Sequence, residues 1–553
     1  MSKKKKDKVI NMTPKGKYRK LSKGNYIALA IMVVLACILF YIFIPALSIY
    51  SVGFWLTSIV ALALIFVATL SYTDSNKVNE MAYNTVVSKT ALVLMTIMMI
   101  AFVIGGIASM KLFSAGTYAG LLTVEDGNFT EDIVETESIN DIAIMDTASA
   151  AIIGNRAIGS LTDIVSQYEV SEDYSQIDYN GKPMKIATLD YAGLIKYFNN
   201  KKSGIPGYVM VDPVNNEATY VKLDKPIKYT PSAFFSEDLG RHLRFQYPTY
   251  IFGSYSFELD NDGNPYYVCS VMKANAGVFG AMDVKGAVIL DPCTGDSEYY
   301  AVGQIPNWVD RVYDGDLLAQ KYDWYGTLSG GFWNSIFGNK GCKMTTDDYG
   351  YKVIDGDVWV YTGVTSVNGD ESNIGFVLMN ERTSEAKYYQ VAGAEEYSAM
   401  SSAQGEVQHL GYVAAFPSLI NIGGEPTYIM ALKDEAGLVK MYALVNVAKY
   451  NIVATGSTQK EALSSYKKLL KENGILSNAA PDEEMPNKKI TITSIRYIEM
   501  DNETYVYITD TQDNVYKQNF AENESLIFLQ EGDTVTVYYE EGENGIKQLS
   551  SYK

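Results

Sequence analysis

The stretch GNYIALAIMVVLACILFYIFIPALSIYSVGFWLTSIVALALIFVATLSYT, residues 24–73, decides the fold, because it carries no charged side chain. A second charge-free run covers residues 90–110. A membrane-spanning helix needs about 20 apolar residues, so the first run can form two spans and the second run one. Pro45 and Gly53 mark a break inside the first run. We therefore predict a three-helix membrane anchor within residues 26–110, with spans at 26–45, 54–72 and 91–109 and a polar loop at 73–90.

Basic residues set the expected orientation of this anchor. Ten Lys and Arg side chains precede the first span, whereas the segment between the first two spans has none. Such residues are retained on the cytoplasmic side. We expect residues 1–25 to form a basic cytoplasmic tail and everything after the third span to be extracytoplasmic. A cleaved signal peptide fits poorly, because the apolar run far exceeds a signal-peptide core.

The two parts of the chain differ strongly in charge. Residues 1–111 hold 13 Lys and Arg against 3 Asp and Glu, while the remainder holds 33 against 61, a net charge of −28. An acidic exterior region disfavours nucleic acid as a partner. It suits a soluble domain in a salty exterior, or a domain that meets a cationic partner or divalent ions.

The four cysteines do not form a disulfide scaffold pattern. Cys37 falls inside the first predicted span, and Cys269, Cys293 and Cys342 lie in the exterior region. A bridge between Cys269 and Cys293 would link neighbouring strands. Three buried thiols fit the spacing equally well, and no CxxC pair is present.

A short pattern recurs four times in the exterior region. The copies are GYVMVDPVNNEATY at 207–220, GAVILDPCTGDSEYY at 286–300, GFVLMNERTSEAKYY at 375–389 and MYALVNVAKY at 441–450. In the first three, a glycine stands five residues before an Asp or Asn that opens a turn. Asp-Pro and Thr-Gly pairs favour turns, so each copy is predicted to be a β-hairpin.

Further elements surround these hairpins. Extended apolar runs precede the later copies at 266–271, 358–362 and 427–432, and helix candidates lie at 147–165, 191–198, 231–239, 308–312 and 394–403. Each unit is therefore expected to combine a helix with a small antiparallel sheet. The predicted fold class is α+β.

One copy resembles a known bacterial module. The segment PYYV at 265–268, followed by VILD at 288–291, Thr294-Gly295 and Tyr299-Tyr300, resembles the ending of the PepSY domain. That family is a small α+β domain found outside the membrane. The other copies depart from it, with Asn215-Asn216 and Thr383-Ser384 in place of Thr-Gly. The resemblance implies binding or regulatory work in the bacterial cell envelope, often linked to peptidases, and supplies no catalytic residue.

The C-terminal part begins with a strongly amphipathic segment. Thr458 and Glu461 predict a capped helix at 458–473, which Gly474 ends, and a linker follows at 478–487. Residues 488–553 read as a small β-barrel of the OB or SH3 type, with strands predicted at 490–499, 504–509, 515–520, 526–529 and 534–539. Its 12 carboxylates against 6 Lys and Arg argue against nucleic acid.

The predicted order of domains follows from these signals. It comprises the tail at 1–25, the membrane anchor at 26–110, a membrane-proximal linker and helix at 111–180, PepSY-like modules at 181–457, a helix and linker at 458–487, and the barrel at 488–553.

Catalytic motifs are weak throughout. His242 and His409 are the only histidines, and the chain has neither a GxSxG motif nor zinc-ligand spacing. Residues 260–264, DNDGN, lack the Gly and Glu that a calcium loop needs, so a hairpin turn is predicted. Ser465 and Lys468 match an SxxK spacing by chance on a helix, and 338–341 reads as a turn. We predict no catalytic, cofactor-binding or metal-binding residue, and no cofactor.

These observations favour a non-enzymatic protein. We expect a membrane-anchored binding or scaffold protein of the cell envelope, with the membrane and either a protein partner or further copies of the chain as its contacts. A regulator or inhibitor of an envelope peptidase is an alternative, and an envelope hydrolase with an unrecognised site is another. Two aromatic-rich stretches, 234–257 and 324–337, are expected to be core rather than a partner surface.

Overall fold

The computed structural model describes residues 21, 23–69, 86–136, 142–367, 372–476, 486–500, 503–541 and 545–552. The chain divides into two compact units. Unit 1 comprises residues 1–127 and 145–391, and unit 2 comprises residues 128–144 and 392–553. Each unit is described by itself.

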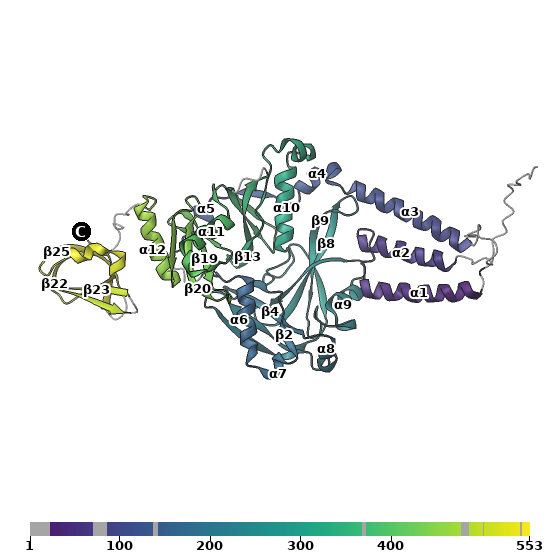
Figure 1. Cartoon of the computed structure of the whole chain (residues 1–553), viewed down its shortest axis with the longest axis horizontal. Helices are drawn as coiled ribbons and strands as arrows, with labels where there is room; N and C mark the ends of the chain where they lie inside the picture. The colour runs from purple at the N-terminus through teal and green to yellow at the C-terminus, as the bar shows by residue number, and fades with distance from the viewer. Residues whose placement is uncertain are drawn as a thin grey trace, which may run out of the picture. The chain divides into compact units, whose positions relative to one another are not determined.

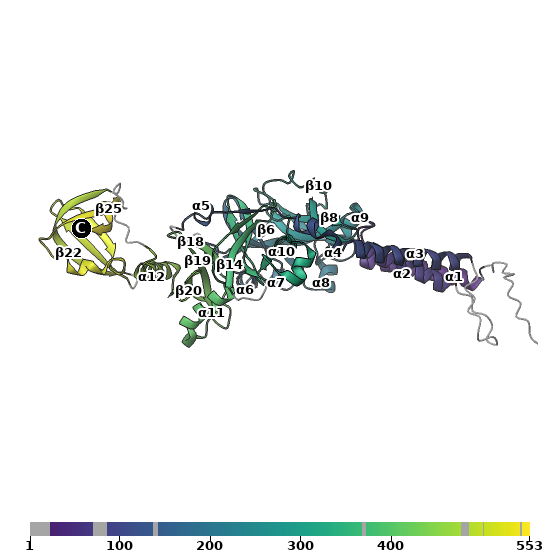
Figure 2. The same ribbon diagram turned by 90° about the horizontal axis from the view of Figure 1, so that it is seen from above.

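Three apolar helices begin unit 1 and lie side by side (Figures 1 and 2). They are α1 (Lys23–Phe43), α2 (Val52–Ala68) and α3 (Val86–Ala108). Among the described residues, α1 and α3 are long and apolar enough to cross a membrane, and α2 is a shorter apolar helix of 17 residues. Only 0% and 11% of the apolar windows of α1 and α3 are buried, unlike the core helix of a soluble domain. Most of the predicted loop at 73–90 lies outside the described residues.

Hydrogen bonds join the C-terminal ends of α1 and α3 to the rest of unit 1. Ser109 Oγ accepts the backbone N–H groups of Val278 (2.9 Å) and Phe279 (2.8 Å) after α3. Arg244 Nε donates to the carbonyl of Ile44 (3.0 Å) after α1. The last turn of a helix leaves carbonyl groups without intrahelical partners, and the Arg244 bond satisfies one of them at Ile44. We call the set of contacts at Ile44 and Ser109 the helix junction.

Unit 1 contains three antiparallel sheets, one of which carries a parallel edge strand. The first is β2-β4-β5-β6 with β3 also on β4, the second is β10-β9-β8-β7, and the third contains β1-β15-β14-β13-β11 with β12 also on β13. The strands are β1 (Val124–Asp126), β2 (Tyr168–Val170), β3 (Ser175–Tyr179), β4 (Lys182–Tyr191), β5 (Ile205–Asp212), β6 (Glu217–Ile227), β7 (Ile251–Leu259), β8 (Pro265–Ala276), β9 (Gly280–Leu290), β10 (Ser297–Ala301), β11 (Lys343–Thr345), β12 (Gly350–Ile354), β13 (Asp357–Ser366), β14 (Ser372–Asn380) and β15 (Ala386–Tyr389).

The recurring sequence pattern forms one hairpin geometry. Its copies are the strand pairs β5–β6, β9–β10 and β14–β15, and β20–β21 in unit 2, as predicted. In unit 1 the side chain of Asp212, Asp291 or Asn380 accepts the backbone N–H groups two and three residues later. The residue four positions after each acceptor has a positive φ, at Asn216 (56°), Gly295 (83°) and Ser384 (62°). The Asn or Asp thus closes the turn with its own side chain.

The glycine of each unit 1 copy lies under a tyrosine of the returning strand. A Cβ atom on Gly286 would collide with the ring of Tyr299 and the carbonyl of Tyr300. Gly207 meets Tyr220 and Gly375 meets Tyr388 in the same way, each tyrosine standing thirteen residues after its glycine. An aromatic ring laid over a glycine pins strand register. The thirteen-residue spacing shared by the three copies therefore has a steric cause.

The remaining helices of unit 1 lie around these sheets (Figure 1). They are α4 (Lys111–Ala119), α6 (Thr147–Gly159), α7 (Thr162–Val165), α8 (Leu194–Asn200), η2 (Phe235–Glu237), α9 (Leu239–Gln246), α10 (Gly315–Leu328) and η3 (Asn334–Gly338). Of these, α6 packs on β5 and β6, and α4 and α10 pack on each other beside β8 and β11. The prediction of a helix at 308–312 is wrong, since the helix begins later, where Asp314 caps α10 through the N–H of Leu317 (2.8 Å). The prediction at 231–239 is also displaced, because Asp238 caps α9.

Unit 2 contains a fourth sheet and a capped helix. Its elements are α5 (Phe129–Asp132), β16 (Gly393–Ala394), α11 (Glu396–Glu406), η4 (Gln408–Leu410), β17 (Val413–Ala414), β18 (Ser418–Ile422), β19 (Glu425–Lys433), β20 (Val439–Asn446), β21 (Val453–Gly456) and α12 (Gln459–Glu472). Thr458 accepts the N–H of Glu461 (3.1 Å), as the sequence predicts. Tyr466 of α12 reaches Thr427 of β19 (2.9 Å), so the helix packs on its own sheet.

The C-terminal strands of unit 2 form a closed barrel, in the order β22-β23-β24-β26-β25. They are β22 (Asn487–Met500), β23 (Glu503–Asp510), β24 (Val515–Asn519), β25 (Thr534–Glu541) and β26 (Ile546–Tyr552), with η5 (Phe520–Glu522) and η6 (Glu524–Phe528) between them. The prediction of a strand at 526–529 is wrong. The Asn523 side chain caps a 3-10 turn there, and β26 supplies the fifth strand.

The three cysteines after the apolar helices are free thiols. Cys269 and Cys342 are buried and Cys293 is half-buried, and none forms a disulfide. Cys293 instead points to the carbonyl of Lys225 (3.2 Å). The possible Cys269–Cys293 bridge is therefore not formed.

The Gly286→Ala variant tests the glycine–tyrosine packing. Its methyl group would overlap the returning strand, so the variant should lose about 1–3 kcal/mol of stability. Thermal unfolding of the purified full-length chain measures the loss. Gly159→Ala is the matched control, because its Cβ meets nothing within 4 Å. Equal stability of the two variants would contradict the packing.

Candidate ligand-binding pocket

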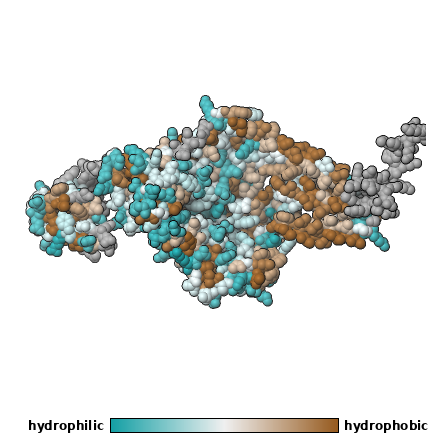
Figure 3. Space-filling model, in the orientation of Figure 1, coloured by the Kyte–Doolittle hydropathy of each residue, from teal (hydrophilic) through white to brown (hydrophobic). Residues whose placement is uncertain are grey.

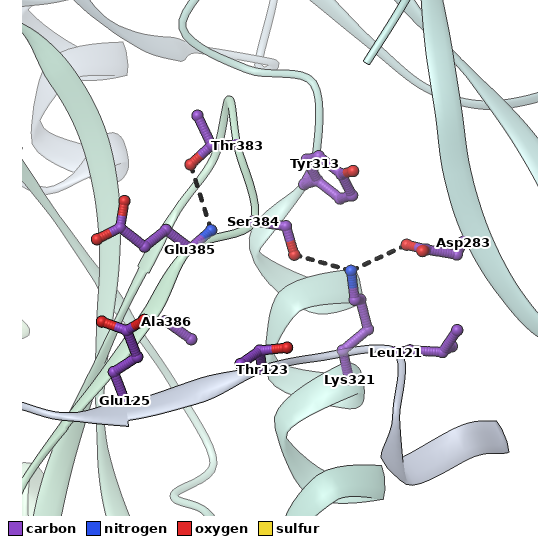
Figure 4. Close-up of a pocket in the computed structure, with 10 residues that line it drawn as sticks. All are labelled: Leu121, Thr123, Glu125, Asp283, Tyr313, Lys321, Thr383, Ser384, Glu385 and Ala386. Carbon is purple, nitrogen blue, oxygen red and sulfur yellow. Dashed lines mark hydrogen bonds and ion pairs between the residues drawn. The ribbon is translucent and has the colours of Figure 1, made fainter. Parts of the chain in front are cut away.

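A polar pocket of about 340 Å³ opens in unit 1 between β1, β9, α10 and the β14–β15 turn (Figure 4). Hydroxyl, carboxylate and ammonium groups make up much of its lining. The lining residues are Leu121, Thr123, Glu125, Asp283, Tyr313, Lys321, Thr383, Ser384, Glu385 and Ala386. A pocket with a few convergent polar groups is the usual form of a small-ligand site.

Lys321 is the central side chain of this pocket. Leu318, Lys321 and Tyr322 share the buried face of α10, which places the lysine only 1% exposed. Its Nζ lies 2.9 Å from Asp283 Oδ1 and 2.8 Å from Ser384 Oγ, as Figure 4 shows. Burial lowers the pKa of Lys321, and the Asp283 carboxylate opposes that effect. A buried ammonium needs such partners to stay charged.

Ser384 is held in a backbone conformation that serine rarely adopts. Its φ of 62° lies in the left-handed region, where the equivalent positions of two other hairpins carry Asn216 and Gly295. The third copy therefore accepts about 1 kcal/mol or more of strain to place a hydroxyl beside Lys321. Strained residues gather at functional sites, which supports this pocket as the candidate.

Carboxylates make the pocket acidic. Glu125 and Glu385 lie together on the side away from Asp283 in Figure 4. With Lys321 as its one cation, the lining has three carboxylates and one ammonium. The pocket therefore suits a polar ligand that carries a positive charge, in keeping with the acidic composition of residues 112–553.

A serine hydroxyl beside a lysine, as in the Ser384–Lys321 contact, is also the arrangement used for acyl transfer. The backbone N–H groups around Ser384 are better suited to a binding site than to that reaction. Such chemistry needs backbone N–H groups free to stabilise an oxyanion. Here the N–H of Thr383 donates to Asn380 Oδ1 (2.9 Å), that of Ser384 to the Asn380 carbonyl (2.9 Å) and that of Glu385 to Thr383 Oγ1 (3.2 Å). The turn uses all three donors beside the serine.

A buried acid cluster lies near the same turn. Glu258 of β7 accepts the N–H groups of Asp310 (2.8 Å) and Arg311 (3.3 Å), and Asp310 accepts the N–H of Asp178 (2.7 Å). Glu381 lies 3.8 Å from Arg311 Nε, and neither of its carboxylate oxygens has a hydrogen-bond partner among the described residues. These carboxylates connect strands of all three unit 1 sheets.

Burial makes Glu381 and Glu258 weaker acids than carboxyl groups in water. It raises the pKa of Glu381 to about 8, against the attraction of Arg311, and raises the pKa of Glu258 to about 7, against its hydrogen bonds with Ser256 and Asp310. The same cause raises the pKa of Asp310 well above its usual range. Burial thus favours the protonated, neutral form of all three carboxyl groups.

The sequence of the repeat itself distinguishes Glu381. The residue after the turn acceptor is proline in two copies, Pro213 and Pro292, and glutamate in the third. A departure from a repeat is a sign of a special site. Lys321, Asp283 and Glu258 stand far apart in the chain, and only the fold brings them near the turn.

The two histidines lie in separate settings. His242 of α9 lies 2.8 Å from the Gly295 carbonyl, and its ring stands 4.1 Å from that of Tyr229. His409 is exposed in η4 of unit 2. No nucleophile contacts either ring in the hydrogen bonds of the described residues.

The remaining candidate motifs are structural. Asp260 Oδ1 accepts the N–H groups of Asp262 (3.0 Å) and Asn264 (2.8 Å), which makes the segment a hairpin turn between β7 and β8, as predicted. Ser465 and Lys468 lie on α12, away from this pocket's lining. No group of three or more His, Cys, Asp or Glu residues suited to a metal ion occurs in the described part of the chain.

Comparison with known proteins gives no family. No family model matches the chain, and no curated protein matches it. Among solved structures, an α-L-arabinofuranosidase from Lactobacillus brevis is 9% identical with a TM-score of 0.15, covering 67% of this chain and 92% of its own. A levansucrase from B. megaterium is 9% identical with a TM-score of 0.17, covering 78% and 96%. Scores this low carry no argument about fold or function.

The Glu381→Gln variant tests the acid cluster through pH. Folding raises the pKa of Glu381 from 4.5 to about 8, so the folded state binds the proton more tightly. Its stability must fall as pH rises through that window, by on the order of several kcal/mol. The variant, which cannot ionise, should gain stability over the natural chain at about pH 8 relative to about pH 5.

Thermal unfolding at the two pH values measures this difference. Glu385→Gln is the matched control, because that carboxylate stands on the same turn with 49% of its side chain exposed. An equal pH response in both variants would show that Glu381 is not the buried acid described.

Proposed function

We propose that the chain is a membrane-anchored extracytoplasmic binding protein of the bacterial cell envelope and that it is not an enzyme. The observation that carries the proposal is the helix junction, which ties the apolar helices directly to the sheets that hold the pocket. A pocket fixed above a membrane by hydrogen bonds at the helix exits is placed to capture a ligand at that surface. The proposal follows from the anchor and from the lining of the pocket together.

In this proposal all three helices cross the membrane. At 1.5 Å per residue α2 spans about 26 Å, close to the hydrocarbon thickness of about 30 Å that a slight local thinning accommodates. The ends of α1 and α3 at Ile44 and Ser109 then emerge on the same side, as a three-span anchor requires. The basic residues before α1 keep the tail in the cytoplasm.

The ligand in this proposal is a partner that presents a cationic group. Glu125 and Glu385 would meet its charge, and Lys321 with Ser384 would hold a neighbouring polar group. The repeated hairpin units are proposed to be PepSY-like modules and the barrel an OB- or SH3-like module, which bind protein or join copies of the chain. The resemblance to PepSY domains and the net charge of −28 over residues 112–553 support a protein partner over nucleic acid.

Protease protection tests the topology. In intact cells or right-side-out vesicles, a tag at the N-terminus should survive external protease, while a tag at the C-terminus should be removed. Detergent should expose both tags. Removal of the N-terminal tag without detergent, or protection of the C-terminal tag, would contradict three spans.

Charge reversal tests the pocket. Extraction of the natural chain from its own membranes should give a particle heavier than the 61.2 kDa chain after allowance for detergent, because a partner remains bound. Glu125→Lys with Glu385→Lys should remove that extra mass, since both side chains would then repel a cation while the buried Lys321 pair stays intact. Glu298→Lys, outside the pocket lining, should keep it.

Native mass spectrometry reads all three samples. Loss of the extra mass in the control as well would show an effect of charge alone. A monomer without bound ligand in the natural chain would contradict a binding role.

A further inference from the structure

Exposed apolar side chains gather at two places in unit 1, outside the pocket and the acid cluster. The first group lies on α8, η2 and α9. It comprises Leu194, Ile195, Phe198, Phe235 and Phe245, which are 46–75% exposed. The rings of Phe198 and Phe235 lie 5.8 Å apart, so they form one apolar surface. The aromatic stretch at 234–257 is thus only partly core, against the sequence prediction.

The second group lies on η3 after α10. It comprises Trp333, Ile336 and Phe337, which are 63%, 54% and 78% exposed. The rings of Trp333 and Phe337 stack at 5.8 Å with planes 10° apart. Two aromatic rings that stack while facing outward cost hydration free energy unless something covers them.

The first group borders the exit end of α1. The ring of Phe245 lies 6.5 Å from that of Tyr41, in the last turn of the helix. Arg241 joins the same place, because its Nε donates to the Tyr41 carbonyl (3.3 Å) and its guanidinium lies 5.2 Å from the Tyr41 ring. The apolar surface of α1 therefore continues onto α9.

The second group borders the exit end of α3 through α4 and α10. Tyr118 donates to the Ser109 carbonyl (2.7 Å) and packs edge-on against Trp324 of α10 at 4.9 Å. The η3 segment follows directly after α10. Figure 3 shows apolar residues covering the three helices and continuing along the upper edge of unit 1, toward the loop after α10.

The charge around both groups differs from the rest of the exterior region. Lys196, Lys201 and Lys202 stand within or beside α8, and Lys340 follows η3. Lys201 Nζ lies 5.5 Å from the Phe198 ring. Aromatic rings with neighbouring basic side chains are typical of protein surfaces at the headgroup level of a bilayer. Lysines at these two places, in a region that is acidic overall, give a local positive charge that would attract anionic lipid headgroups.

We propose that these two groups, the membrane rim, rest in the outer headgroup region of the bilayer that α1–α3 enter. The inference rests on the proposed function, because it needs the helices to span. It adds that the exterior region lies down on the lipid surface. Lipid covers the rim because the apolar surface is continuous with the helices and its charge suits anionic headgroups.

Tryptophan quenching tests the membrane rim in the full-length chain. The chain is reconstituted into vesicles of phosphatidylcholine and phosphatidylglycerol whose acyl chains are brominated near the headgroup. Trp55 lies in α2 and reports insertion, whereas Trp333 reports the rim. Trp324 and Trp359 are buried and Trp308 is half-buried against Tyr266, so these three tryptophans remain in every variant as the internal reference.

Three variants separate the signals. Trp333→Phe should keep strong quenching through Trp55, which confirms insertion. Trp55→Phe should remain quenched through Trp333, and Trp55→Phe with Trp333→Phe should fall about twofold or more below it. Equal quenching of the last two variants, with Trp55 still quenched, would overturn the rim and leave the anchor intact. Loss of quenching at Trp55 would overturn the anchor itself.

A second copy of the chain is the rival occupant of the rim. In that case Trp333 would escape the brominated lipid, and Trp333→Phe with Phe337→Ser would reduce the mass of the reconstituted particle. The lipid proposal expects no change of mass in that variant. A Trp333 that escapes quenching, or a loss of particle mass in this variant, would overturn the lipid proposal.

Discussion

The helix junction is the constraint on which the rest of unit 1 depends. The last turn of a helix exposes carbonyl groups that need partners. Here Arg244 reaches the Ile44 carbonyl after α1, and the Ser109 side chain after α3 receives the Val278 and Phe279 amides of the β8–β9 turn. The second sheet is thereby fixed to the helices, and the pocket next to β9 inherits a defined position relative to them.

One hairpin geometry then recurs in all three sheets of unit 1. An Asp or Asn closes the turn, and a glycine accepts a tyrosine from the returning strand. The third unit 1 copy alters this plan, with Glu381 where other copies have proline and Ser384 where they have Asn or Gly. Those two changes place a carboxylate in the acid cluster and a hydroxyl beside Lys321. The repeat thus supplies both the frame and the site.

Local signals in the sequence predicted local structure well. Hairpins from turn residues, the Thr458–Glu461 cap and the apolar helices all depend on neighbours in the chain, and the structure contains them. The strand expected at 526–529 and the helix expected at 308–312 are absent, because Asn523 caps a 3-10 turn in the first case and Asp314 starts α10 after the predicted helix in the second. The pocket could not be predicted, since Asp283, Lys321 and Ser384 meet only through tertiary packing.

An engineered disulfide tests the helix junction most directly. A Cβ atom on Gly105 would lie 3.4 Å from that of Val278, close to the separation of about 3.8 Å in a natural disulfide. Gly105→Cys with Val278→Cys should form a bridge in native membranes, seen by mass spectrometry of the linked peptides. Gly106→Cys with Val278→Cys should not, because Gly106 meets nothing within 4 Å. No bridge in the first pair, or equal bridging in both, would contradict the account.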